Sequence, residues 1–108
     1  MKTNRKVKFK EWNCLLNIGQ YHNGRIALWL TDKEDHSNIA TATVNLPDNL
    51  LQEGYVHVKE WSENKGMTQA LVDAGVVKNT GLRIPVGPYG SYATLCKLLI
   101  ENEKDSSS

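Results

Sequence analysis

Two apolar rows that alternate with polar residues face each other across a turn, and this pattern constrains the fold most. One row takes every second position from 12 to 18, and the other takes every second position from 26 to 30. The rows are Trp12, Cys14, Leu16 and Ile18, then Ile26, Leu28 and Leu30. Alternation of this kind is typical of strands with one buried face, so the segment predicts an antiparallel hairpin.

The loop of this hairpin, residues 21–25, decides which side chains share a face. A two-residue turn would pair Ile18 with Trp29 and place the two apolar rows on opposite faces. A three-residue loop with Gly24 left-handed pairs Ile18 with Leu28 and brings both rows to one core. The pattern therefore predicts the three-residue loop. Trp29 then lies on the other, partly polar face, where either the rest of the domain or a partner covers it.

The remainder of the chain predicts further strands and one helix. Strands are expected at residues 39–46, 55–59, 82–86 and 92–100. The last is weakly alternating and is expected to be a central strand, a short helix being the alternative. Residues 62–75 have apolar side chains at helical spacing, with Ser62 or Asn64 as the N-cap and Gly75 as the C-terminal cap. The sum is an α+β domain: a mostly antiparallel sheet of about five strands with one main helix packed on one face.

The chain of 108 residues is long enough for one domain. Residues 1–8 are expected to be a flexible basic arm, residues 9–100 the single α+β domain, and residues 101–108 a disordered tail. No apolar stretch is long enough to span a membrane, and no signal peptide is evident, which favours the cytoplasm. Cys14 and Cys96 are expected to be buried free thiols, a disulfide between strands being the alternative.

No residue pattern predicts a catalytic centre, a metal site or a cofactor. His22, His36 and His57 lack metal-binding spacing and are expected to face solvent. The acidic loop 32–38 lacks the glycine and the distal glutamate of a calcium loop, so it is expected to be solvated. No glycine-rich phosphate motif occurs, and no serine or cysteine has an evident base. These observations favour a binding protein over an enzyme.

Four segments carry a resemblance to a known family. They are Phe9 to Trp29, Val44-Asn45-Leu46-Pro47-Asp48, Trp61-Ser62-Glu63-Asn64-Lys65-Gly66-Met67, and Ala70 to Val77 with Thr80-Gly81. Over roughly residues 9–99 the chain resembles an uncharacterised family of small proteins carried by phages, plasmids and integrative elements of bacteria. The resemblance implies no catalytic or ligand-binding residues. It implies a protein that acts on host machinery, as anti-CRISPR and other anti-defence proteins do.

The leading functional hypothesis is a non-enzymatic interaction protein that inhibits a host protein, such as a CRISPR effector or another defence nuclease. Its candidate contact residues are Trp29, Asp32, Glu34, Asp35, Trp61, Pro85 and Tyr89. The alternative is a nucleic-acid-binding accessory protein that acts through Arg5, Lys6, Lys8 and Lys10. A formal net charge of only +1 weakens that alternative. The third hypothesis is a small enzyme with an unrecognised site. A domain of this size can also form a homodimer through an uncovered apolar face of its sheet.

Overall fold

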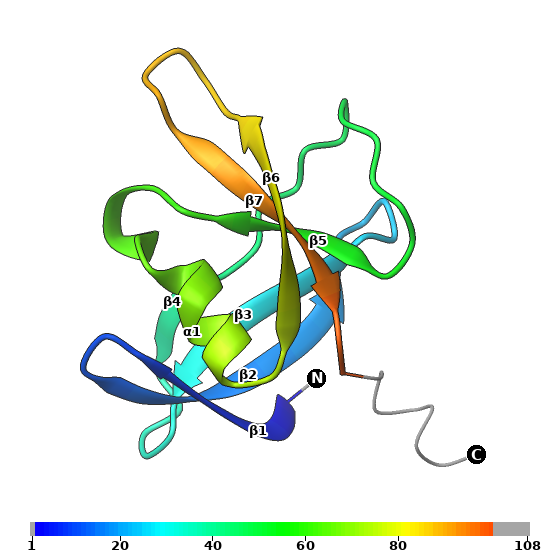
Figure 1. The fold of residues 1–108 in the computed structure, drawn as a ribbon. Coiled ribbons are helices and arrows are strands. Elements are labelled where there is room, and N and C mark those ends of the chain that lie inside the picture. Colours follow the sequence, from blue (N-terminus) through cyan, green and yellow to red (C-terminus); the bar gives the residue numbers. More distant parts are fainter. Residues whose placement is uncertain (1, 101–108) are drawn as a thin grey trace.

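A computed structural model describes residues 2–100, which form two antiparallel sheets and one short helix (Figure 1). The first sheet has the strand order β1 (Lys2–Phe9), β2 (Trp12–Gln20), β3 (Ile26–Asp32) and β4 (Asn38–Thr41). The second has the order β5 (Tyr55–Lys59), β7 (Tyr92–Leu98) and β6 (Val77–Pro85). The 3-10 turn η1 (Ser62–Asn64) and helix α1 (Met67–Asp73) connect β5 to β6. The α+β class is confirmed, but seven strands in two sheets replace the predicted sheet of about five.

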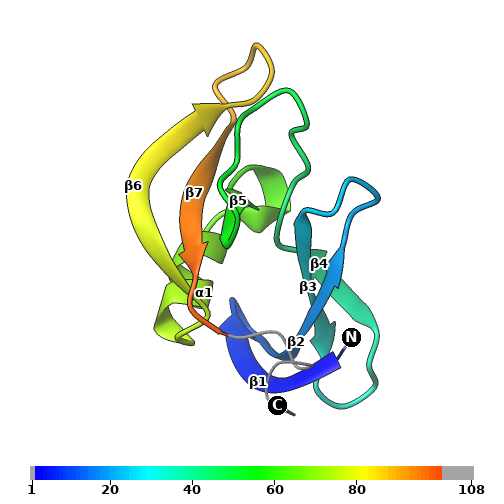
Figure 2. The ribbon, with the colours of Figure 1, turned by 90° about the vertical axis from the view of Figure 1, so that its right-hand side faces the viewer.

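The segment that follows β4 joins the two sheets. Ala42 donates its N–H to the carbonyl of Leu28 in β3, at 2.8 Å, and accepts from the N–H of Lys59 in β5, also at 2.8 Å. Thr43 forms an isolated antiparallel bridge with Val58. The two sheets therefore meet along one hydrogen-bonded seam. Figure 2 shows them curving around a shared interior.

This interior is the apolar core, and both sheets and the helix contribute to it. Its buried members include Val7, Phe9, Leu16, Leu28, Leu30, Val56, Val58, Met67, Leu71 and Cys96. Helix α1 packs against β1, β5 and β6 and so closes the interior on one side. Each fully buried leucine or valine of this kind stabilises a fold by roughly 1.5–3 kcal/mol relative to an exposed one.

The pairing of β2 with β3 confirms the three-residue loop. Ile18 pairs with Leu28, as that loop requires. The N–H of Tyr21 donates to the carbonyl of Arg25 at 2.8 Å, which closes the loop. Gly24 has a φ of 88°, a left-handed conformation that glycine adopts without strain. Cys14, Leu16 and Ile18 consequently face the core together with the row from Ile26 to Leu30, whereas Trp12 at the start of β2 is exposed.

The N-terminal segment differs from the prediction of a separate basic arm over residues 1–8. From residue 2 onward this segment is strand β1, which pairs with β2 along the edge of the first sheet. Val7 and Phe9 are buried, with exposed fractions of 1% and 2%. These apolar residues alternate with lysines, and burying them outweighs the tendency of a basic segment to remain in solvent. Residue 1 and the tail at 101–108 lie outside the described residues.

The helix is shorter than the predicted span of 62–75. Gly66 has a φ of 91° and separates η1 from α1, because a left-handed residue cannot continue a right-handed helix. The predicted C-terminal cap at Gly75 is confirmed. There, the N–H of Val76 donates to the carbonyl of Leu71 at 2.9 Å, the bond expected of a Schellman motif.

The remaining strands match the prediction in part. Strand β7 lies in the centre of the second sheet, so the central strand expected at 92–100 is confirmed. Strand β4 ends at Thr41, well short of the predicted end at 46. Strand β6 begins at Val77, ahead of the strand predicted at 82–86, and the register shift between Asn79 and Arg83 marks a bulge within it.

Candidate functional site

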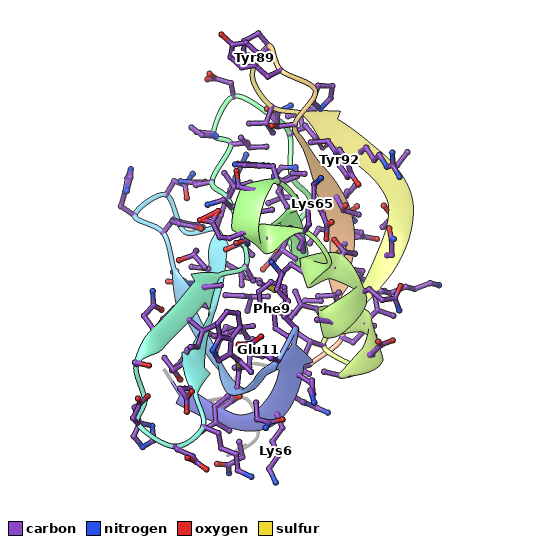
Figure 3. All side chains as sticks on the ribbon, turned by 90° about the vertical axis from the view of Figure 1, so that its left-hand side faces the viewer. Lys6, Phe9, Glu11, Lys65, Tyr89 and Tyr92 are labelled. Atoms are coloured by element: carbon purple, nitrogen blue, oxygen red, sulfur yellow. The ribbon has the colours of Figure 1, made fainter. Side chains whose placement is uncertain are left out.

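Aromatic side chains from two loops gather at one end of the second sheet. They border a hollow of 570 Å³ between the segment before α1 and the loop that joins β6 to β7. Its lining includes Glu60, Trp61, Lys65, Tyr89 and Tyr92. In Figure 3, Tyr89 lies at the tip of the hairpin, with Tyr92 and Lys65 below it. We call these five residues, together with Lys59 and Arg83, the aromatic surface.

Two cations of the aromatic surface lie against its rings. The Nζ of Lys59 is 5.5 Å from the centroid of the Trp61 ring. The guanidinium carbon of Arg83 is 4.4 Å from the centroid of the Tyr92 ring. Cation–π contacts at these distances restrict both rings and cations. Tyr89 has no such restraint and is 92% exposed, so its whole ring is available to a partner.

The wall of the hollow next to α1 is held in place by Glu60. The two carboxylate oxygens of Glu60 accept from the backbone N–H groups of Gly66, at 3.2 Å, and Thr68, at 2.6 Å. A carboxylate at the start of a helix accepts hydrogen bonds from free amides and interacts favourably with the positive end of the helix dipole. Neither Ser62 nor Asn64, the two predicted N-cap residues, makes a side-chain capping bond. Asn64 is buried instead, and its side-chain amide donates to the carbonyl of Thr41 at 2.7 Å.

Some of the residues predicted to bind protein come together here. Trp61 and Tyr89 line the same hollow, and Pro85 pairs with Tyr92 at the end of β6. The structure places the others on the first sheet or in the β3–β4 loop. Those residues are Trp29, Asp32, Glu34 and Asp35. Tyr92 and Arg83 are not among the predicted residues, because their position next to the hollow depends on strand pairing that local sequence patterns do not show.

Trp29 is half-buried on the outer face of the first sheet, as the register predicts. A Cβ atom built on Gly19 would lie 3.1 Å from the indole ring, so the ring lies directly over the backbone of β2. Asn17, which pairs with Trp29, is only 5% exposed. The domain itself therefore covers part of this tryptophan.

The acidic loop between β3 and β4 folds back on itself. Asp32 accepts from the backbone N–H of Glu34 at 2.8 Å, and Asp35 accepts from that of Ser37 at 2.9 Å. The hydrogen bond from Ser37 lowers the pKa of the Asp35 carboxyl. Across residues 2–100, no three histidine, cysteine or carboxylate side chains lie close enough together to hold a metal ion. The carboxylates of this loop thus stabilise a turn.

The basic residues of β1 divide into separate groups. Lys6 and Lys8 alternate with the buried residues of β1 and point to the outer face of the first sheet. Lys10 follows the strand and donates to the carbonyl of Glu63 at 2.7 Å. Arg5 lies toward the end of α1, and both it and Lys6 line a hollow of 690 Å³ beside that end. Of the four predicted nucleic-acid-binding residues, Lys6 thus shares one hollow with Arg5 and another with Lys8, while Lys10 lies apart from both hollows.

The two cysteines are buried free thiols, as predicted. Burial raises the pKa of both, and it raises the pKa of Cys96 to about 12. The nearby carboxylates of Asp32 and Glu60 add to the shift at Cys14 and Cys96 respectively. Because the thiolate is the nucleophilic form, neither cysteine is activated for covalent chemistry at neutral pH.

His57 contradicts the prediction that the histidines face solvent. It is only 2% exposed, and neither ring nitrogen has a hydrogen-bond partner. Strand β5 has neighbours on both sides, β7 on one and residues 42–44 on the other, and this position buries the imidazole. Burial, followed by the charge of Arg25, lowers the pKa of His57. The ring is therefore held in its neutral form.

No family model, curated protein or solved structure matches the chain. The resemblance to proteins of mobile elements stays a prediction. Within residues 2–100, the single α-helix falls far short of the length and apolar character that a membrane crossing demands.

Proposed function

We propose that this chain is a non-enzymatic protein-interaction module that contacts its partner through the aromatic surface. The observation that carries the proposal is the convergence of Trp61, Tyr89 and Tyr92 on one hollow. Tryptophan, tyrosine and arginine are the side chains that most often dominate the binding energy of protein interfaces. Arg83, stacked on Tyr92, adds the third of these residue types.

The hollow of the aromatic surface is lined by one cation and one carboxylate, because Lys59 and Arg83 stack on the rings beside it, and this balance favours a protein over a polyanion. Glu60 and Lys65 line the same hollow, so a negative and a positive group lie side by side. A nucleic-acid backbone would meet the carboxylate as well as the ammonium and gain little net attraction. A protein surface with charges of both signs can pair with each of them.

The resemblance to mobile-element proteins suggests the identity of this partner. It would be a host protein, such as a CRISPR effector or another defence nuclease. The chain would inhibit that partner by occupying a surface that the partner needs, with no bond made or broken.

The test starts with affinity capture from a bacterial host and continues with the purified partner. We expect Tyr89→Ala to weaken the partner's binding about 30-fold, because the ring is fully available to the interface. Leu50→Ala is the matched control, since Leu50 is 99% exposed on another loop. Its affinity should equal that of the unchanged protein.

Both variants must keep the thermal unfolding midpoint of the unchanged protein, which shows that the fold is intact. A captured partner that binds Tyr89→Ala and Trp61→Ala as tightly as the unchanged protein would remove the aromatic surface from the proposal.

A further inference from the structure

The outer face of the first sheet differs in charge from the aromatic surface. The outward positions 13, 15, 17 and 19 of β2 and 27, 29 and 31 of β3 hold no charged residue. On the adjoining β1, Lys6 pairs with Leu15 and Lys8 pairs with Asn13, so both lysines point to this face. The strand residues of this face therefore combine cations with uncharged side chains.

A third lysine joins these two around one hollow. Lys6, Lys8 and Lys33 line a hollow of 390 Å³ at the edge of the sheet, where β1 lies against α1 and where Ala70 and Asp73 of the helix form part of the wall. Asp73 is the carboxylate in that lining, and it already accepts a hydrogen bond from Gln69 at 2.8 Å. Three ammonium groups against one hydrogen-bonded carboxylate favour an anionic ligand.

Lys33 also borders a second hollow, and the other charged residues of that hollow are acidic. These acidic residues are Glu11, Asp32 and Glu34. Asp32 accepts from backbone amides of its own loop, as described above. These carboxylates reduce the attraction at Lys33, so Lys6 and Lys8 supply most of it.

Trp29 gives the same face a platform for stacking. The indole lies over the backbone of Gly19, where an added Cβ would meet it at 3.1 Å, and the half-buried ring keeps part of its surface exposed. Trp29 is two residues along β3 from Thr31, which shares a row with Leu15 and Lys6. Strand geometry then puts Trp29 and Lys6 about 12 Å apart, a span that a short oligonucleotide covers.

We infer that the outer face of the first sheet binds single-stranded nucleic acid, with a base stacked on Trp29 and phosphates held by Lys6, Lys8 and Lys33. Unpaired bases stack on aromatic rings regardless of sequence, while lysines follow the backbone. A duplex offers no free base to the indole. This surface shares no residue with the aromatic surface, so the inference stands apart from the proposed function.

Fluorescence anisotropy of a labelled oligothymidine tests the inference with the full chain at low ionic strength. We expect Trp29→Ala to weaken binding about 10-fold without changing the salt dependence, because stacking involves no counterion release. Trp29→Phe keeps a ring and should retain part of the affinity. The Lys6→Gln/Lys8→Gln variant should weaken binding and lower the slope of log affinity against log salt by about 1.4.

The matched control is Lys78→Gln/Lys97→Gln, which removes two exposed lysines that pair across β6 and β7. This control, and Tyr89→Ala, should bind the oligonucleotide as the unchanged protein does. A duplex of the same length should bind more weakly than the single strand. Absence of binding by the unchanged protein, an equal loss in the control, or full affinity in a folded Trp29→Ala variant would each overturn the inference.

Discussion

The hairpin β2–β3 and the hairpin β6–β7 have the same antiparallel pairing but opposite roles. In β2–β3 the register is unbroken, and the inward side chains Leu16, Leu28 and Leu30 are fully buried. In β6–β7 a bulge interrupts the register, most of β6 is exposed, and Tyr89 projects from the loop. The comparison teaches that the first hairpin contributes both strands to the core, whereas the second buries β7 and leaves β6 and the loop at Tyr89 exposed.

The largest expected effect is a core substitution in the first hairpin. Leu28→Ala should lower the free energy of unfolding by about 2–5 kcal/mol, because it leaves a cavity among fully buried side chains. Leu82→Ala in β6 is the counterpart, since Leu82 is 58% exposed, and its cost should stay below about 0.5 kcal/mol. Urea denaturation of both variants measures the difference. Equal losses would show that the two hairpins contribute alike to stability.

A second expectation concerns pH and belongs to the second sheet. Because the pKa of His57 is lowered in the folded state, the unfolded chain binds a proton first as the pH falls below about 6.5. Stability is therefore fully present above that pH and falls toward the folded pKa, by at most about 1.4 kcal/mol per pH unit.

Denaturation over a series of pH values measures this slope. His57→Leu should reduce it, because leucine fills a similar space without a titrating group. An unaltered slope in His57→Leu would mean that another group is responsible.

The smallest expected effect is the loss of the cap that holds one wall of the aromatic surface. Glu60→Ala should lower the free energy of unfolding by about 1 kcal/mol, because it leaves the amides of Gly66 and Thr68 without their acceptor. Glu63→Ala removes an exposed carboxylate from the same segment and should cost less than about 0.5 kcal/mol. Thermal unfolding of the two variants compares them, and equal midpoints would contradict a capping role for Glu60.

The hairpin at residues 12–30 could be predicted in detail because its pattern is local. The positions of its apolar residues allow one register only, and Gly24 provides the backbone that this register needs. The first strand was harder to predict, because the charge of its lysines masks the alternation of Val7 and Phe9.

The assembly of the aromatic surface could not be predicted from local patterns. Trp61 and Tyr89 were identified separately, but their proximity depends on β5 pairing with β7, where Lys59 meets Ala93. The cap at Glu60 has a similar origin. Its carboxylate reaches Thr68 across the break at Gly66, which a continuous helix would not require.

The hydrogen bonds of residues 42 and 44 extend the ladder from one sheet into the other. The amide of Ala42 donates to β3, while the amide of Val44 donates to the carbonyl of His57 in β5. Separating the two sheets means breaking these hydrogen bonds and exposing the core at the same time, so neither sheet can unfold alone. Amide hydrogens at both positions should consequently exchange with deuterium only when the entire molecule unfolds, and a chain cut between them should lose both sheets together.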